Sequence, residues 1–393
     1  MLSMNPSNHK NPVIAGTPLI GEGNIIDNRA ILHALAKAGM PGLGFYPNGP
    51  FVKLGRDFHI RMSMSTQKTM EYARTSNTTR RSLRVTPLRW ELRREIKKAK
   101  TMYPDAICFI TSQSMMAEES IGIRDNIPTI MASSDVSGKY TYDSKVSERQ
   151  KEIMYLVWNR EALQLYKHEL KLEHVYLIKP FDPLLAFEPI EISRLPFQFA
   201  LDDPHVCFMK LSGSGGNPKL VNAAINSLWE KSRVKSIVFP GTEKINSKII
   251  KTVSSNVTVN TSCDASVFYH HARVIIPNEQ MLLAYPSEQV KHVAILTQNN
   301  IFPNIVWLPP RGVHEADNLA WAIKKGFSGT ICIPDHYHSV LKKSLIKSGI
   351  NSSSVECVDP DNLSAEHFKP SPVFKSEEEA CSLESVIRKI VSV

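Results

Sequence analysis

The sequence predicts an α/β protein made of two domains of similar size, each built on a parallel sheet, and three observations support this. The chain has 393 residues, about two and a half times the length of a typical single domain. Short β-type runs alternate with amphipathic helical runs along almost all of it, which is typical of parallel α/β layers. A proline-rich stretch from Lys179 to Pro196 interrupts the alternation near residue 185 and predicts a linker.

The first half opens with a predicted strand at residues 11–16, a loop at 17–24 and a helix from about Ile25 to Ala38. Ile31 and Leu35 lie on one face of this helix, and Gly39 is a suitable C-terminal stop. The other elements predicted for this half are strands at 106–111, 128–132 and 175–178, and helices at about 117–124, 148–158 and 161–172.

The alternation restarts after the proline-rich stretch. The predicted order is a strand at 205–211, a glycine-rich loop at 212–216, a helix at 219–231, strands at 235–239, 257–260, 273–276, 293–297, 305–308 and 330–333, and late helices at about 314–325 and 337–347. A tail helix at 377–390 can pack back on the first domain. The predicted architecture is therefore two Rossmann-like domains, residues 1–184 and 185–393, that face each other across a cleft.

Composition and cysteine spacing indicate the compartment. Apolar residues make up 42% and charged residues 22% of the chain, which excludes a largely disordered protein or a fibre. The six cysteines lie far apart without a C-x-x-C pair, so we expect no zinc knuckle or disulfide scaffold. Residues 1–10 lack the apolar core of a signal peptide, and no run approaches the roughly 18 apolar residues of a spanning helix. We expect a cytoplasmic protein.

Positive charge is concentrated in one segment. The net charge is +9, and the segment from Lys53 to Lys100 alone carries 14 Lys and Arg against four acids, a balance of +10. The segment also contains amphipathic hydrophobic residues, among them Trp90 and Ile96. Such a field attracts phosphate on an anionic bilayer, a phosphorylated acceptor or a nucleic acid, and we expect peripheral attachment at the inner face of the membrane. A helix whose charges simply face water is the alternative.

The loop at the start of the second half has the chemistry of a diphosphate site. Its candidate binding residues are Gly213, Ser214, Gly215, Gly216 and Asn217. Glycines let backbone amides approach a ligand, Asn217 is a plausible N-cap, and Pro218 suits the first helical position. Free amides and the helix dipole then favour an anion. The loop lacks the G-K-[ST] of a Walker loop and the last glycine of G-x-G-x-x-G, so a purely structural turn is the alternative.

The first half offers acids at corresponding places. Its early loop contains Gly21, Glu22, Gly23 and Asn24. Glu22 can act as a general base at the mouth of a cleft if burial raises its pKa. Asp135 follows another strand, and the carboxyl ends of strands are where open α/β sheets bind ligands. The simpler interpretations are an acid that complements the helix dipole at Glu22 and a turn or N-cap residue at Asp135.

A third stretch runs from Leu308 to Asn318, where a strand leads into a proline-rich loop and a helix. Its candidate residues are Arg311 for a phosphate and Glu315, Asp317 and Asn318 for sugar hydroxyls. Ordinary helix capping is the alternative. Neither His270-His271 nor Asp335–His338 has a spacing that places three ligands on one ion, so we predict no metal site.

Together these stretches resemble glycosyltransferases of the GT-B fold, and more narrowly the family of the peptidoglycan N-acetylglucosaminyltransferase and the monogalactosyldiacylglycerol synthase. The resemblance covers residues 13–335 and rests on the loop at 21–24, the strand and glycine loop at 208–217, and the stretch from Leu308 to Ala320. The chain departs from the family in two places. The G-x-x-[ST]-x-x-E signature is not intact around residues 273–288, and Glu22 and Asn24 replace the histidine of the first loop.

The resemblance implies an enzyme that moves a sugar from a nucleoside diphosphate, UDP being expected, to an acceptor hydroxyl, without a metal or other cofactor and with inversion. It implies that the glycine loop holds the nucleoside diphosphate, that Glu315, Asp317 and Asn318 hold the sugar, that Glu288 or Glu279 holds the ribose, and that Gly21, Gly23 and Asn24 lie on the acceptor side. The family binds its acceptor beside a basic, apolar, membrane-facing segment, where residues 53–100 would fall. The alternatives are a nucleotide-sugar epimerase, a non-catalytic GT-B-like binding protein, and a nucleic-acid base glucosyltransferase.

Overall fold

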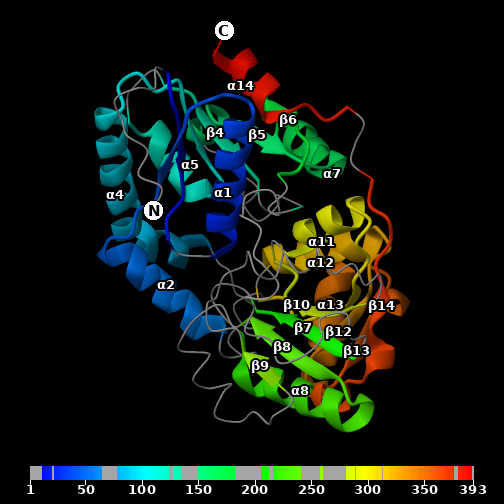
Figure 1. Cartoon of the computed structure of the whole chain (residues 1–393). Helices are drawn as coiled ribbons and strands as arrows, with labels where there is room; N and C mark the ends of the chain where they lie inside the picture. Colours follow the sequence, from blue (N-terminus) through cyan, green and yellow to red (C-terminus); the bar gives the residue numbers. More distant parts are fainter. Residues whose placement is uncertain are drawn as a thin grey trace.

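The computed structural model describes residues 11–19, 22–63, 78–123, 127–133, 136, 148–181, 205–211, 216–239, 257–259, 280–287, 289–311, 313–375 and 379–391. Within these ranges the strands form two separate sheets, one from each half of the chain, with helices around both (Figure 1). The linker predicted near residue 185 falls between residues 181 and 205, outside the described part.

The first sheet is parallel and has the strand order β2-β1-β3-β4-β5-β6. Its strands are β1 (Val13–Gly16), β2 (Gly42–Phe45), β3 (Cys108–Thr111), β4 (Thr129–Ala132), β5 (Met154–Val157) and β6 (Val175–Leu177). The helices are α1 (Glu22–Lys37), α2 (Pro50–Ser63), α4 (Thr78–Met102), α5 (Ser114–Ile121), α6 (Glu148–Lys151) and α7 (Arg160–Gln164). Every residue of β1, β3 and β4 is buried, as expected where helices cover both faces of a sheet.

The second sheet has the order β13-β12-β11-β10-β7-β8-β9, with β14 antiparallel to β11 and all other described pairs parallel. Its strands are β7 (Val206–Lys210), β8 (Lys235–Phe239), β9 (Val257–Val259), β10 (Met281–Ala284), β11 (Asn304–Trp307), β12 (Thr330–Cys332), β13 (Glu356–Val358) and β14 (Lys369–Pro370). Its helices are α8 (Pro218–Ser232), α11 (Gln289–Gln298), α12 (Val313–Lys324) and α13 (His338–Lys347).

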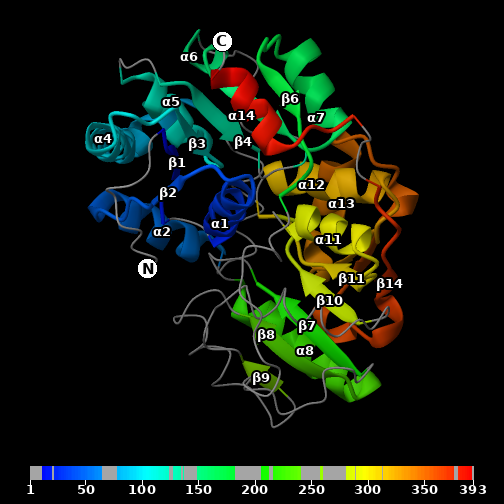
Figure 2. The same cartoon turned by 45° about the horizontal axis from the view of Figure 1, so that its top comes forward.

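The chain crosses back to the first half at its end. Helix α14 (Leu383–Val391) packs against the first sheet, where Ile387 and Ile390 share a buried cluster with Val13 and Leu35. In Figures 1 and 2 this red helix lies beside the first-half strands β4 and β6, away from the sheet that precedes it in sequence. The tail therefore ties the two halves together.

Two predicted elements have the wrong type. The helix predicted at 148–158 contains only α6, because Met154–Val157 forms β5 between β4 and β6. The strand predicted at 293–297 lies inside α11, whose residues from Gln289 to Thr297 are all buried. A short apolar run fits a buried strand or a buried helix equally well, so periodicity could not separate them.

Other predicted elements differ from the structure in their bounds, were missed, or fall outside the described residues. Helix α1 begins at Glu22, so Glu22, Gly23 and Asn24 form its first turn instead of a loop. Strands β2, β10 and β13 were not predicted, and each has only three or four residues. The strand predicted at 273–276 lies outside the described residues. The fold class, an α/β protein with two parallel sheets, agrees with the prediction.

Candidate functional site

Three neighbouring strands of the second half end at one edge of its sheet. Strand β10 lies between β7 and β11, and its last residue, Ala284, pairs in register with Lys210 and with Trp307. The chain leaves these strands toward the glycine loop, toward Tyr285 and toward Arg311. Parallel strands end at the same edge, so the topology brings these loops together at the position where α/β proteins bind ligands.

Arg311 and Glu315 form a close ion pair at the start of α12. The carboxylate of Glu315 accepts hydrogen bonds from the Arg311 backbone amide at 2.6 Å, from Nε at 3.1 Å and from Nη2 at 2.5 Å. Their side chains are only 12% and 2% exposed. Glu315 is thus engaged by Arg311, and it gives the guanidinium a fixed orientation. The structure therefore brings these two predicted residues together, but the Glu315 carboxylate binds Arg311, where the sequence predicted a contact with sugar hydroxyls.

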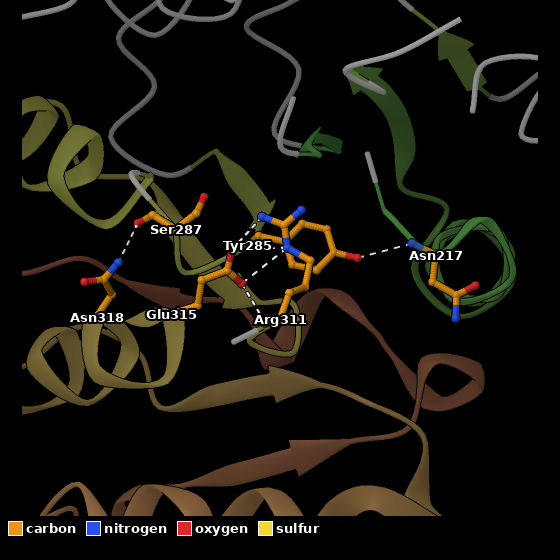
Figure 3. A network of polar contacts seen from close by, with 6 residues as sticks. All are labelled: Asn217, Tyr285, Ser287, Arg311, Glu315 and Asn318. Atoms are coloured by element: carbon orange, nitrogen blue, oxygen red, sulfur yellow. Dashed lines mark hydrogen bonds and ion pairs between the residues drawn. The ribbon is translucent and has the colours of Figure 1, made fainter. Parts of the chain in front are cut away.

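Tyr285 connects this pair to Asn217 at the end of the glycine loop, and it is not among the residues predicted from the sequence. The Arg311 guanidinium lies over the Tyr285 ring, 4.4 Å from its centroid. The Tyr285 hydroxyl accepts a hydrogen bond from the Asn217 backbone amide at 3.3 Å (Figure 3). Burial raises the pKa of Tyr285 to about 12, so the hydroxyl keeps its proton at neutral pH. A tyrosine directly after an apolar strand was the only local signal.

Gly216, the last residue of the glycine loop, packs directly against the Tyr285 side chain. A Cβ on Gly216 would lie 2.9 Å from the Tyr285 hydroxyl oxygen, closer than side chains normally approach, so a larger residue here would have to displace the tyrosine. Asn217 is the N-cap of α8, as predicted, and its Oδ1 accepts from the Lys219 amide at 3.0 Å. Pro218 occupies the first helical turn, also as predicted. Gly213, Ser214 and Gly215 lie outside the described residues.

Asn318 joins the two halves. Its Oδ1 accepts from the Val136 amide at 3.1 Å, and its Nδ2 donates to the Ser287 carbonyl at 3.4 Å. The side chain of Asn159 donates to the Val136 carbonyl at 2.9 Å, so the backbone of Val136 is held from both halves. Asn318 is fully buried. Its amide is therefore bound within the protein, where the sequence predicted a sugar contact.

The remaining predicted residues are more dispersed. Asp317 accepts from the Ser348 hydroxyl at 3.1 Å, on the side of α12 that faces α13. Glu22 and Gly23 lie in the first turn of α1, where their side-chain surroundings are not described, and the Asn24 carbonyl accepts from the Ser112 hydroxyl at 3.4 Å. Gly21, Asp135 and Glu288 lie outside the described residues.

A second polar group crosses between the halves at α1 and α11. Lys291 Nζ lies 2.5 Å from Asp27 Oδ1, and His292 Nε2 lies 3.8 Å from the same oxygen. All three residues are almost fully buried. Burial acts to raise the pKa of Asp27, but the charge of Lys291 and the contact with His292 outweigh it and hold this pKa below its ordinary value. Asp27 is therefore an ionised partner of Lys291.

Within the described ranges, no three His, Cys, Asp or Glu side chains are grouped in a way that could hold a metal ion.

No protein-family model matches the chain, and no curated protein sequence matches it. Solved structures are similar over nearly its whole length. A putative UDP-N-acetylglucosamine 2-epimerase from Listeria monocytogenes is 9% identical with a TM-score of 0.55, over 97% of this chain and 95% of that one. Arabidopsis thaliana UGT89C1 complexed with UDP is 10% identical with a TM-score of 0.52, over 98% and 99%. The class is thus a two-domain α/β protein, and its fold is GT-B, as predicted.

Proposed function

We propose that this protein is a glycosyltransferase that moves a sugar from a nucleoside diphosphate donor, UDP-linked, to an acceptor hydroxyl. The observation that carries the proposal is the edge of the second sheet, where Arg311, Tyr285 and the N-terminus of α8 come together. A cation, a hydroxyl and a helix N-terminus are groups that recognise phosphate. One similar structure contains UDP and the other is named for a UDP-sugar, which supports UDP as the nucleotide.

The proposed reaction is a direct displacement that inverts the anomeric centre. A carboxylate of the first half, Glu22 first and Asp135 second, takes the proton of the acceptor hydroxyl as its oxygen bonds to the anomeric carbon. The bond from that carbon to the diphosphate breaks, and the electron pair leaves with the diphosphate. Glu22 sits in the first turn of α1, where the helix dipole favours the ionised form that a base needs.

The leaving diphosphate gains negative charge, and the second half supplies donors for it. The amides of Ser214, Gly215 and Gly216 and the N-terminus of α8 are expected to bind it without a metal. Arg311 adds an oriented guanidinium. Because Glu315 compensates its charge, Arg311 acts through directed hydrogen bonds more than through net charge.

A thermal-shift screen tests the donor assignment. The unfolding midpoint is measured with UDP, GDP, CDP, ADP and dTDP and with their common sugar conjugates, with and without EDTA. We expect UDP and its sugars to raise the midpoint, because a ligand at one hundred times its Kd stabilises the folded state by about 2.7 kcal/mol. We expect EDTA to change nothing. A flat response to every nucleotide would favour a non-catalytic GT-B-like protein.

An epimerase is the second candidate, because the Listeria structure that aligns along 97% of this chain is named as one. Incubation with UDP-N-acetylglucosamine separates the two activities. Transfer to an acceptor or to water releases UDP. Epimerisation gives an isomeric UDP-sugar of unchanged mass and no UDP, which chromatography of the products detects. The isomer without UDP release would refute the glycosyltransferase.

We propose that the acceptor is anionic or membrane-associated and meets the exposed face of α4. Trp90 and Met102 are 59% and 66% exposed, and the Arg94 guanidinium lies 5.2 Å from the centre of the Trp90 ring. The other exposed cations of this face are Arg93, Lys97 and Lys98. Aromatic and basic side chains together favour an anionic lipid surface. No described helix is long and apolar enough to cross a membrane.

Vesicle sedimentation tests this surface. Each basic residue near an anionic bilayer contributes about 1 kcal/mol, and Glu95 already pairs with Lys98 at 2.9 Å, so the double variant Lys97→Gln/Lys98→Gln should bind phosphatidylglycerol vesicles roughly 5- to 30-fold more weakly. The matched control, Lys343→Gln/Lys347→Gln, removes two exposed lysines of α13 in the second half. Equal losses in both variants, or equal binding to neutral phosphatidylcholine, would refute the assignment. Binding to DNA that falls steeply with salt would instead indicate a nucleic-acid acceptor.

A further inference from the structure

Two buried hydroxyl groups follow β10 at the edge where the donor is expected. Tyr285 is 2% exposed and Ser287 is 4% exposed. In Figure 3 the Ser287 hydroxyl points away from Asn318, toward the side on which Tyr285 and Arg311 lie. Asn217, the Tyr285 hydroxyl, the Arg311 guanidinium and Ser287 follow one another across this view.

Both hydroxyls have donor capacity that the described residues do not use. The Tyr285 oxygen accepts from the Asn217 amide, and its own proton has no acceptor among the residues that the structure describes. The Ser287 oxygen has no hydrogen-bond partner within the same residues. Leaving a buried polar group unpaired costs free energy, about 1–3 kcal/mol each. Two such groups that follow the same strand at this edge therefore point to a ligand that accepts hydrogen bonds.

The surroundings select an anionic ligand. The Asn217 amide belongs to the N-terminal end of α8, where the helix dipole is positive, and it withdraws electron density from the tyrosine oxygen that it contacts. Arg311 lies over the ring of the same tyrosine. The carboxylate of Glu315 is already bound by Arg311, so it does not compete for the hydroxyl proton.

We propose that Tyr285 is a donor-binding residue whose hydroxyl hydrogen-bonds a phosphate oxygen of the nucleoside diphosphate. The Asn217 amide already donates to the tyrosine oxygen, so it is not available to the ligand. The Tyr285 hydroxyl, polarised by that amide at the positive end of α8, donates to the phosphate in its place. This inference rests on the proposed function, because it names a contact within the same donor site.

Isothermal titration of Tyr285→Phe tests the inference, with UDP, uridine and inorganic pyrophosphate as probes. A hydrogen bond to a charged group contributes about 1.5–3 kcal/mol, so UDP and pyrophosphate should bind roughly 10- to 150-fold more weakly. Uridine, which has no phosphate, should bind as it does to the wild type. Ser287→Ala, which removes a hydroxyl without a described partner, should also weaken UDP binding.

The matched control is Tyr155→Phe. Tyr155 is fully buried in the first half and its hydroxyl donates to the Gln150 carbonyl at 2.9 Å, so this variant loses a buried tyrosine hydrogen bond far from the site. It should bind UDP normally. Unchanged UDP and pyrophosphate affinity in Tyr285→Phe would overturn the inference and leave the proposed function standing. A wild-type protein that binds neither UDP nor pyrophosphate would overturn both.

Discussion

Removing one partner of the buried ion pair between Asp27 and Lys291 is expected to destabilise the contact between the two halves strongly. Its charged atoms are 2.5 Å apart and its side chains are 2% and 3% exposed. A second cross-half pair, Lys325 with Glu161, has the same separation, but its side chains are 32% and 48% exposed. The two pairs therefore differ in burial and not in distance.

Burial decides the magnitude of the effect. Asp27→Ala leaves the lysine charged and unpaired in a dry interior, which costs about 3–5 kcal/mol, whereas an exposed pair contributes about 0–1 kcal/mol. With a shift of about 2–4 °C per kcal/mol, Asp27→Ala should lower the unfolding midpoint by roughly 6–20 °C. Lys325→Ala should lower it by less than about 4 °C.

Differential scanning fluorimetry of both variants, together with the double variant Asp27→Leu/Lys291→Met, measures these shifts. The double variant removes both charges and should recover most of the loss, because an apolar pair of similar volume is often as stable as a buried ion pair. Equal shifts in Asp27→Ala and Lys325→Ala, or a double variant no better than the single one, would refute the reasoning from burial.

Three further predictions concern pH, packing and thiol reactivity. The pKa of Asp27 is lowered in the folded state, so the ionised carboxylate stabilises the fold above the unfolded pKa near 3.9, and this stabilisation is lost as pH falls through the folded pKa. The difference in unfolding midpoint between wild type and Asp27→Asn should therefore be constant from about pH 5 to 8 and shrink below about pH 4. Gly216→Ala should displace Tyr285 and weaken UDP binding in a titration, while Gly122→Ala, whose Cβ would lie no closer than 3.4 Å to a neighbour, should not. Among the five described cysteines, mass spectrometry after brief alkylation at pH 8 should find the exposed Cys381 modified first and Cys108 unmodified, because burial raises the pKa of Cys108 to about 12; early labelling of Cys108 would contradict this.

Sequence patterns predicted the structure correctly where it depends on residues that are close together along the chain. Asn217 and Pro218 predict the start of α8 because a cap and a first-turn proline act within one helical turn. Alternating apolar runs predict the α/β class because burial on parallel layers needs only the right pattern. The same signals failed at α11, since a run buried on all sides carries no period that separates helix from strand.

The residues of the candidate site also divide into those that the sequence identified and those that only the tertiary structure brought together. Arg311 and Glu315 were identified from sequence as a phosphate ligand and a sugar ligand, because a cation and an acid follow a predicted strand, but their pairing with each other was not predicted and appears only in the structure. Tyr285 was missed because its partner Asn217 is 68 residues away, and only the adjacency of β7 and β10 brings them together.

The sequence by itself determined the α/β class, the cap of α8 and the basic composition of α4, because each depends on residues close together along the chain. Only the tertiary structure decided which residues of the two halves contact each other. Asn318 holds Val136 across the halves, Lys291 finds Asp27 at a sequence distance of 264 residues, and α14 returns to the first sheet. Such contacts depend on strand order and on how the two sheets are packed together, and no local pattern in the chain encodes either.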